Sequence, residues 1–157
     1  MIRVTFVCLG NICRSPMGEF IFKKMVQERG LEEYFSIRSA GTSGEEAGNH
    51  VYPPAKRELL KHGISCEGKR AIKLSPADFE QNDYFLCMDR GNLRSANKIF
   101  GTSDKQFLMM SFTGRDEEVA DPWYTGDFSG VYSQIEEGCL YFLKFLERNC
   151  QISLENN

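Results

Sequence analysis

Residues 2–16 read IRVTFVCLGNICRSP, and this stretch predicts a strand, a tight loop and the start of a helix. Residues 2–7 are rich in β-branched and aromatic side chains, which is typical of a buried strand. A polar segment containing glycine follows and favours a loop. Ser15 can then cap a helix whose first turn accommodates Pro16, so the first unit is expected to be strand, loop and helix.

The rest of the chain continues this alternation. Apolar runs predict further strands at residues 34–39, 84–88 and 106–110. Helical spacing of apolar residues predicts helices at residues 53–63, 92–99 and 129–148, with a helical turn at 76–80. Alternating strands and helices indicate an α/β fold with a parallel sheet covered on both faces. We expect one domain over residues 1–157, with a frayed tail at residues 151–157.

Composition and charge exclude several classes of protein. The chain has 157 residues, and 22 acidic against 19 basic side chains give a net charge of -3, which disfavours nucleic-acid binding. No apolar stretch approaches the ~20 residues that a membrane-spanning helix needs. The first residues lack the basic stretch followed by a long apolar stretch that is typical of a secretory signal. We therefore expect a cytoplasmic monomer with no membrane span and no nucleic-acid partner.

The cysteine pattern favours reduced thiols. Six cysteines could form three disulfides in a small secreted domain, but the chain is longer than such domains, and Cys87 and Cys139 lie in apolar runs. No C-x-x-C pair occurs, and His50 and His62 are the only histidines, so no zinc site is expected. In a reducing compartment, an unusual cysteine is more often catalytic than structural.

The loop after the first predicted strand has the properties of an oxyanion site. Gly10 allows successive backbone N–H groups to point inward, the helix N-terminus adds a positive dipole end, and Arg14 offers a two-point contact. The same field favours a thiolate at Cys8, beneath a bound phosphorus, with Ser15 as a hydroxyl donor to the sulfur. The alternative is a buried cysteine and a solvated arginine, because a C-x5-R spacing is common by chance. Here the glycine, cysteine, arginine, serine and proline are all in register with a predicted strand and helix, which favours the phosphate-binding interpretation over this alternative.

The segment VCLGNICRSPMGE (residues 7–19) resembles the low molecular weight protein tyrosine phosphatases. The resemblance covers essentially the whole chain and includes SAGT at 39–42, HGI at 62–64, CMD at 87–89, NL at 92–93 and DPWY at 121–124. It implies a flavodoxin-like, four-stranded parallel sheet with helices on both faces, in three α/β/α layers. It also implies hydrolysis of phosphotyrosine and aryl phosphates in two steps through a phosphocysteine, with no metal or other cofactor.

The same resemblance implies a role for each matching residue. Cys8 is then the nucleophile, Arg14 the phosphate clamp and Asp121 the general acid and base. The phosphate-binding loop comprises Leu9, Gly10, Asn11, Ile12, Cys13, Arg14 and Ser15. Positions that support the loop and the thiolate are matched by Asn11, Ser15 and Ser39. Cys13 matches a cysteine that forms a reversible disulfide with the nucleophile and so protects it from irreversible oxidation.

Apart from the resemblance, the residue types around Asp121 also suggest a general acid and a wall for the substrate. Asp121 precedes a proline in a loop, so its side chain can project toward the carboxyl edge of the sheet, where acid–base help is worth about 10²–10⁴ in rate. Alone, such a residue is usually a turn residue; beside the cysteine loop, the catalytic role is favoured. Trp123 and Tyr124 are candidate walls for an aryl ring, and the resemblance implies that Tyr124 could be phosphorylated.

Some positions leave alternatives open. In the resemblance, Glu45 stands where many relatives carry an aromatic wall residue, so Tyr52 could fill that space, the slot could be open and acidic, or Glu45 could simply be a solvated side chain. His62 is expected to be structural, at a helix end. Asp83 and Asp89 could each orient Arg14 or cap the next helix.

Two other functions compete with a phosphatase. An arsenate reductase of the same fold needs two further cysteines; Cys87 could be one, but residues 90–100 contain none and Asp121 would have no clear duty. A module that only reads phosphate would keep Arg14 and the loop while dispensing with Cys8 and Asp121, and both are present.

Overall fold

The computed structural model describes residues 1–149 and contains four parallel strands in the order β2-β1-β3-β4. The strands are β1 (Ile2–Cys8), β2 (Phe35–Gly41), β3 (Tyr84–Cys87) and β4 (Gln106–Leu108). The helices are α1 (Arg14–Glu28), α2 (Pro53–Lys61), α3 (Arg90–Phe100), α4 (Pro122–Thr125) and α5 (Phe128–Arg148). Short 3₁₀ turns are Glu32–Tyr34, Pro76–Asp78 and Met109–Thr113. The predicted α/β fold with a four-stranded parallel sheet is confirmed.

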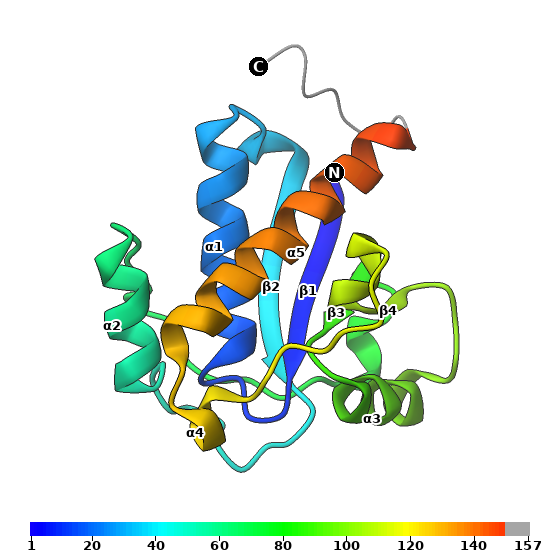
Figure 1. Ribbon diagram of the computed structural model, residues 1–157. Helices are drawn as coiled ribbons and strands as arrows, with labels where there is room; N and C mark the ends of the chain where they lie inside the picture. Colours follow the sequence, from blue (N-terminus) through cyan, green and yellow to red (C-terminus); the bar gives the residue numbers. More distant parts are fainter. Residues whose placement is uncertain (150–157) are drawn as a thin grey trace.

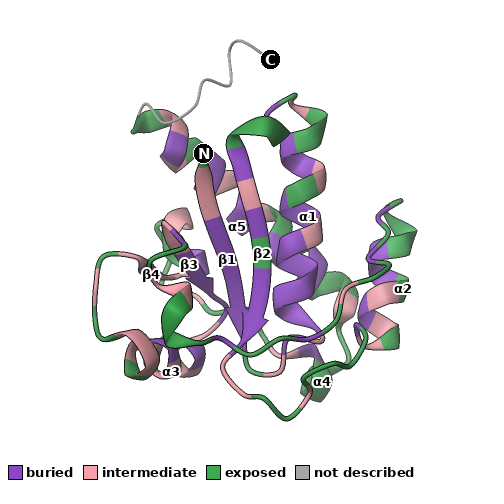
Figure 2. Ribbon diagram, turned by 180° about the vertical axis from the view of Figure 1, so that it is seen from behind, coloured by how far each residue is buried: buried purple, intermediate pink, exposed green. Residues whose placement is uncertain are grey.

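The sheet lies between two layers of helices. Helices α1 and α5 pack against each other and cover one face, with α2 beside them, whereas α3 packs on β3 and β4 (Figure 1). Alternation along β1 serves both layers: Val4 and Phe6 enter the larger core with α1 and α5, and Val7 enters the smaller core with Ala96 of α3. Figure 2 shows β1 as almost entirely buried toward its carboxyl end. The central strand therefore delivers the residues that follow it to a rigid edge.

Several expected boundaries are corrected by the structure. Ser15 does not cap α1: the cap position is Cys13, without a side-chain hydrogen bond, because the Ser15 hydroxyl turns toward the end of β1. The strand expected at 106–110 stops at Leu108, where the backbone tightens into the 3₁₀ turn Met109–Thr113. Helix α3 begins at Arg90, two residues earlier than expected. The expected frayed tail at 151–157 lies outside the described residues.

Within residues 1–149, the longest helices are too short or too polar to cross a bilayer.

Candidate active site

The loop between β1 and α1 turns its carbonyl groups outward. The carbonyl oxygens of Cys8, Leu9, Ile12 and Cys13 accept the backbone N–H groups of Thr42, Ser43, Tyr52 and Met17, at 2.8–3.1 Å. By contrast, none of the N–H groups of residues 9–15 donates to another residue in the described part of the chain. These donors surround the carboxyl end of β1 at the start of a helix. The loop is thus an anion cradle built from backbone.

Asn11 holds the loop in this shape. Its φ of 58° places it in the left-handed region, which Asn tolerates better than most residues. Its buried side-chain amide donates to Ser15 Oγ at 2.8 Å and to Ser39 Oγ at 3.0 Å, while its Oδ1 accepts the N–H of Ile72 at 3.0 Å. The loop is therefore tied to α1, β2 and the segment containing Ile72.

Cys8 ends β1 at the floor of this cradle and is buried. Its Sγ lies 2.9 Å from Ser15 Oγ. Because the Ser15 hydroxyl already accepts a hydrogen bond from Asn11, its own proton is free to point at the sulfur. The Ser15 hydroxyl is thus placed to donate a hydrogen bond to the Cys8 sulfur.

Arg14 is held from behind so that its guanidinium faces the pocket. Its side chain is 4% exposed, and Nη1 donates to Asp89 Oδ2 at 2.8 Å and to the Val119 carbonyl at 2.9 Å. Asp89 also caps α3 through Asn92, whose N–H lies 2.8 Å from Oδ1. The alternatives left open by the sequence are therefore resolved: Asp89 both orients Arg14 and caps the helix.

Asp83 and His62 have structural contacts away from the loop. The Asp83 carboxylate pairs with Arg3 at 3.0 Å, and that hydrogen bond lowers its pKa. His62 Nε2 lies 3.1 Å from Glu58, and its ring stacks on Tyr132 with centroids 3.7 Å apart. The structural role expected for His62 agrees with these contacts.

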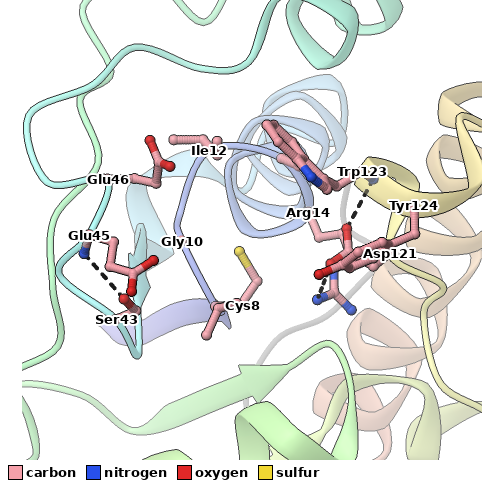
Figure 3. A pocket seen from close by; sticks show the side chains of 12 residues that line it. Cys8, Gly10, Ile12, Arg14, Ser43, Glu45, Glu46, Asp121, Trp123 and Tyr124 are labelled. Carbon is pink, nitrogen blue, oxygen red and sulfur yellow. Dashed lines mark hydrogen bonds and ion pairs between the residues drawn. The ribbon is translucent and has the colours of Figure 1, made fainter.

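Asp121 comes from the far end of the chain to the same pocket. It precedes α4 and caps it, with Oδ1 accepting the Trp123 N–H at 3.0 Å. Its Oδ2 lies 3.6 Å from Arg14 Nη2. Figure 3 shows Arg14 and Asp121 on one side of the pocket and the Cys8 sulfur facing into it. The structure thus brings together all three residues that the sequence suggested for catalysis.

The pocket above the sulfur is an open cavity of about 240 Å³. Trp123 and Tyr124 line one side and are 54% and 83% exposed, while Glu45 and Glu46 line the other (Figure 3). Tyr52 is not among the residues that line the slot; its ring packs against that of Trp123, with centroids 4.7 Å apart. The slot therefore has an aromatic side and an acidic side.

Cys13 lines the same pocket as Cys8 and is also buried. Burial raises the pKa of the Cys13 thiol to about 12, and the nearby charge of Cys8 acts in the same direction. Cys87 is fully buried, lies outside the pocket lining, and has a pKa raised by the same desolvation. Among the cysteines of residues 1–149, Cys13 is the one that lines the same cavity as Cys8.

Sequence reasoning missed two charged residues below the loop. Glu19 accepts a hydrogen bond from Ser39 at 2.6 Å, and Lys69 lies 3.5 Å from Glu19. Glu19 follows Ser15 by four residues, so helical periodicity could have placed both on one face of α1. Lys69 carries no local signal, because only the tertiary fold brings it there. Among residues 1–149, no group of three His, Cys, Asp or Glu side chains is arranged to hold a metal ion.

Comparison with known proteins gives full-length matches. Residues 3–152 match the family model described as low molecular weight phosphotyrosine protein phosphatase. The chain is 38% identical over 156 residues to the low molecular weight protein-tyrosine-phosphatase YfkJ of Bacillus subtilis, covering 97% of this chain and 100% of that protein. It is 39% identical over 150 residues to the low molecular weight phosphotyrosine protein phosphatase of Schizosaccharomyces pombe, covering 91% and 96%. The crystal structure of Bacillus subtilis YfkJ superposes with a TM-score of 0.91 at 36% identity, covering 95% and 96% of the chains.

Proposed function

The chain belongs to the low molecular weight phosphotyrosine protein phosphatase family and is a phosphatase enzyme, and we propose that it hydrolyses phosphotyrosine and aryl phosphates through a phosphocysteine formed on Cys8. The observation that carries this proposal is the cradle of N–H groups at residues 9–15, with the Cys8 sulfur at its floor and Arg14 at its rim. A phosphate seated there presents its phosphorus to the sulfur. We propose Trp123 and Tyr124 as walls for the aryl ring.

In the first step, the loop N–H groups and Arg14 bind the non-bridging oxygens, whose charge they stabilise as it develops. The Cys8 thiolate attacks phosphorus, so that the S–P bond forms while the bond from phosphorus to the aryl oxygen breaks. Asp121, as the acid, gives its proton to that leaving oxygen. The products are the free phenol and phosphocysteine.

In the second step, the Asp121 carboxylate accepts a proton from water as the water oxygen attacks phosphorus. The P–S bond breaks, inorganic phosphate forms, and Cys8 leaves as a thiolate. Ser15 stabilises that leaving thiolate through the 2.9 Å contact of its hydroxyl with Sγ. Asp121 is then protonated again for the next cycle.

The test is a comparison of Cys8→Ser and Arg14→Lys with the unmodified chain on p-nitrophenyl phosphate. We expect Cys8→Ser to lose turnover but to retain binding of vanadate or phosphate, because the loop N–H groups remain. Arg14→Lys is expected to lose activity as well, because an ammonium cannot reproduce the planar two-point clamp. Substantial hydrolysis by Cys8→Ser would contradict the phosphocysteine step.

The competing functions are tested in the same assay. An arsenate reductase would consume arsenate with thioredoxin and would need further cysteines to carry the disulfide outward, yet Cys87 is fully buried away from the pocket. A module that only reads phosphate would bind aryl phosphates without turnover, although Asp121 lies beside Arg14. Turnover of aryl phosphate without thioredoxin supports the phosphatase over both.

Redox control is a further part of the proposal. A peroxide-oxidised Cys8 can be captured by Cys13 as a disulfide, with loss of water from the sulfenic acid, and a dithiol reductant restores both thiols. The shared pocket of the two cysteines supports this pairing. Mass spectrometry of peroxide-treated protein should find a link between Cys8 and Cys13, and Cys13→Ser should recover poorly; full recovery of that variant would exclude the role.

The expected monomeric state and cytoplasmic location stay predictions. Size-exclusion chromatography with light scattering tests the first, and fractionation of cells that express the chain tests the second.

A further inference from the structure

The aromatic side of the slot packs against a ring that does not line the slot itself. Trp123 lines the pocket, and the ring of Tyr52 packs against it with centroids 4.7 Å and planes 46° apart. The ring of Phe128, at the start of α5, lies 6.1 Å from that of Tyr52. Tyr52 thus contacts the proposed substrate wall from a position outside the lining of the pocket.

The backbone of Tyr52 is fixed beside the loop between β1 and α1. Its N–H donates to the Ile12 carbonyl at 2.8 Å, and its own carbonyl accepts the Lys56 N–H of α2 at 3.0 Å. Pro53 follows, and a residue before proline is restricted to extended backbone, which the ψ of 132° at Tyr52 matches. The side chain of Tyr52 therefore projects from a backbone that has little freedom to move.

Trp123 depends on such support because its own helix is short. Its backbone N–H donates to Asp121 Oδ1 at 3.0 Å at the start of α4, a helix of four residues. The residue is 54% exposed, so its indole can change rotamer unless another group packs against it. Within residues 1–149, Tyr52 is the aromatic ring that contacts this indole. Tyr52 thus connects the loop that carries the sulfur to the segment that carries Asp121.

The opposite side of the slot offers no aromatic face. Glu45 and Glu46 line that side, so the aromatic faces of the lining come from Trp123 and Tyr124 (Figure 3). Tyr124 is 83% exposed and less constrained by packing than Trp123. Aromatic rings attract each other beyond the area that they bury, and a side chain that is already ordered loses little entropy when a ligand arrives. A fixed indole at Trp123 therefore favours ligands that carry a flat ring.

We propose that Tyr52 is a positioning residue that sets the preference of this slot for aryl phosphates, because its ring holds Trp123 where the ring of the substrate stacks. The proposal rests on the function proposed above, since it concerns binding in the same pocket. It assigns a specificity role to a side chain that lies outside the pocket lining.

Calorimetry with phenylphosphonate and inorganic phosphate separates the contribution of the ring from that of the anion. Tyr52→Ala should bind phenylphosphonate about threefold to tenfold more weakly, because the supporting ring is lost. Its affinity for inorganic phosphate should be unchanged, because the loop N–H groups and the bond to the Ile12 carbonyl belong to the backbone. Tyr52→Phe keeps the ring and should restore the binding of phenylphosphonate.

Tyr34→Ala is the matched control. It removes a half-exposed ring just before β2, at the end of the sheet away from the pocket. Both affinities of this variant should stay within about twofold of those of the unmodified chain. If Tyr52→Ala does not fold, Tyr52→Leu fills the same site without a flat face and should show the same selective loss.

The fluorescence of Trp123 reports on the wall directly, because it is the only tryptophan of the chain. Tyr52→Ala should shift the emission to longer wavelength and increase its quenching by acrylamide, since the indole loses a packed neighbour. Tyr52→Phe should match the unmodified chain. An emission and a quenching that do not change in Tyr52→Ala would contradict the support of Trp123 by Tyr52.

A double-mutant cycle tests whether Tyr52 acts through Trp123. In a Trp123→Ala background, Tyr52→Ala should cause no further loss of phenylphosphonate affinity. Losses that add in the double variant, or equal losses for phenylphosphonate and phosphate in Tyr52→Ala, would overturn the proposal. Because these measurements need no turnover, a chain that binds both ligands as expected but hydrolyses no aryl phosphate would contradict the proposed function instead.

Discussion

Replacing Asp89 by Asn isolates the support of Arg14, the proposed phosphate clamp. The two carboxylate oxygens of Asp89 make different contacts, since Oδ1 accepts the Asn92 N–H that caps α3 and Oδ2 accepts Arg14 Nη1. An Asn side chain has a single acceptor oxygen, and its other terminal atom is a donor. If that oxygen keeps the cap, the amide nitrogen faces Arg14, donor against donor.

The size of the effect follows from these two bonds. A hydrogen bond to a charged group is worth about 1.5–3 kcal/mol, so loss of the Arg14 contact should lower kcat/KM roughly 10-fold to 150-fold, if Arg14 binds the transition state. The cap itself should survive, because Asn and Asp are about equally good at this position. We therefore expect the free energy of unfolding to fall by about the 1.5–3 kcal/mol of the lost Arg14 contact, with the α3 cap intact, the chain still folded and the activity reduced steeply.

The assay pairs steady-state kinetics on p-nitrophenyl phosphate with urea unfolding. Asp127→Asn is the matched control, because Asp127 caps α5 through Gly130 and lacks a contact with Arg14 among the described residues. It should leave both quantities nearly unchanged. A kcat/KM for Asp89→Asn within twofold of the unmodified chain would refute the reasoning, as would a loss of activity that matches a loss of folded protein.

Three further outcomes are expected. Asp121→Asn should slow hydrolysis of phenyl phosphates with alkyl substituents far more than that of nitrophenyl phosphates, since only a basic leaving oxygen needs the acid; equal losses in a Hammett series would instead mean a structural role. Burial raises the pKa of Cys13 to about 12, above the ~8.5 of a free thiol. The stability that the neutral Cys13 thiol contributes is therefore complete below pH ~8.5 and is lost as the pH rises toward 12. In urea titrations between about pH 9 and 11, Cys13→Ser should lose less stability than the unmodified chain. The Arg3 hydrogen bond lowers the pKa of Asp83, so the stability contributed by the Asp83 carboxylate is present above pH ~3.9 and is lost as the pH falls below that value. Asp83→Asn should therefore weaken the fall of the melting temperature at acid pH, and an unchanged fall would contradict this.

The sequence predicted local features of the fold well and long-range contacts poorly. The strand, loop and helix at residues 2–16 follow from side-chain type, glycine and proline. The prediction that Ser15 caps α1 was wrong, because a hydroxyl at that position can bond either to the backbone or across the loop. The left-handed turn at Asn11 shapes the loop so that the hydroxyl contacts the Cys8 sulfur instead. The shorter last strand has a similar cause, since the apolar side chains of Met109 and Met110 can be buried in a 3₁₀ turn as well as in a strand.

The site shows the same division. Cys8 and Arg14 lie within one loop and could be interpreted from local chemistry, whereas the acid role predicted for Asp121 was favoured only in combination with them. Asp89 was left open because its two roles depend on where α3 docks. Lys69 could not be found, because nothing in its sequence neighbourhood indicates that its amine reaches Glu19, fifty positions earlier in the chain.

The hydrogen bond from Arg14 to the Val119 carbonyl joins residues 105 positions apart. During synthesis, the loop that carries Cys8 leaves the ribosome before the segment that orients Arg14 and carries the proposed acid, Asp121, which follows more than a hundred residues later. Strand β1 also cannot complete its pairing until β3 has been made, because β1 lies between β2 and β3 in the sheet. Such distant pairings form slowly, since the entropy of closing the long loop must be overcome before the contact contributes. A nascent chain therefore carries the cysteine loop without Asp121 until more than a hundred further residues have been made, and the proposed catalytic residues come together late in the folding of this domain.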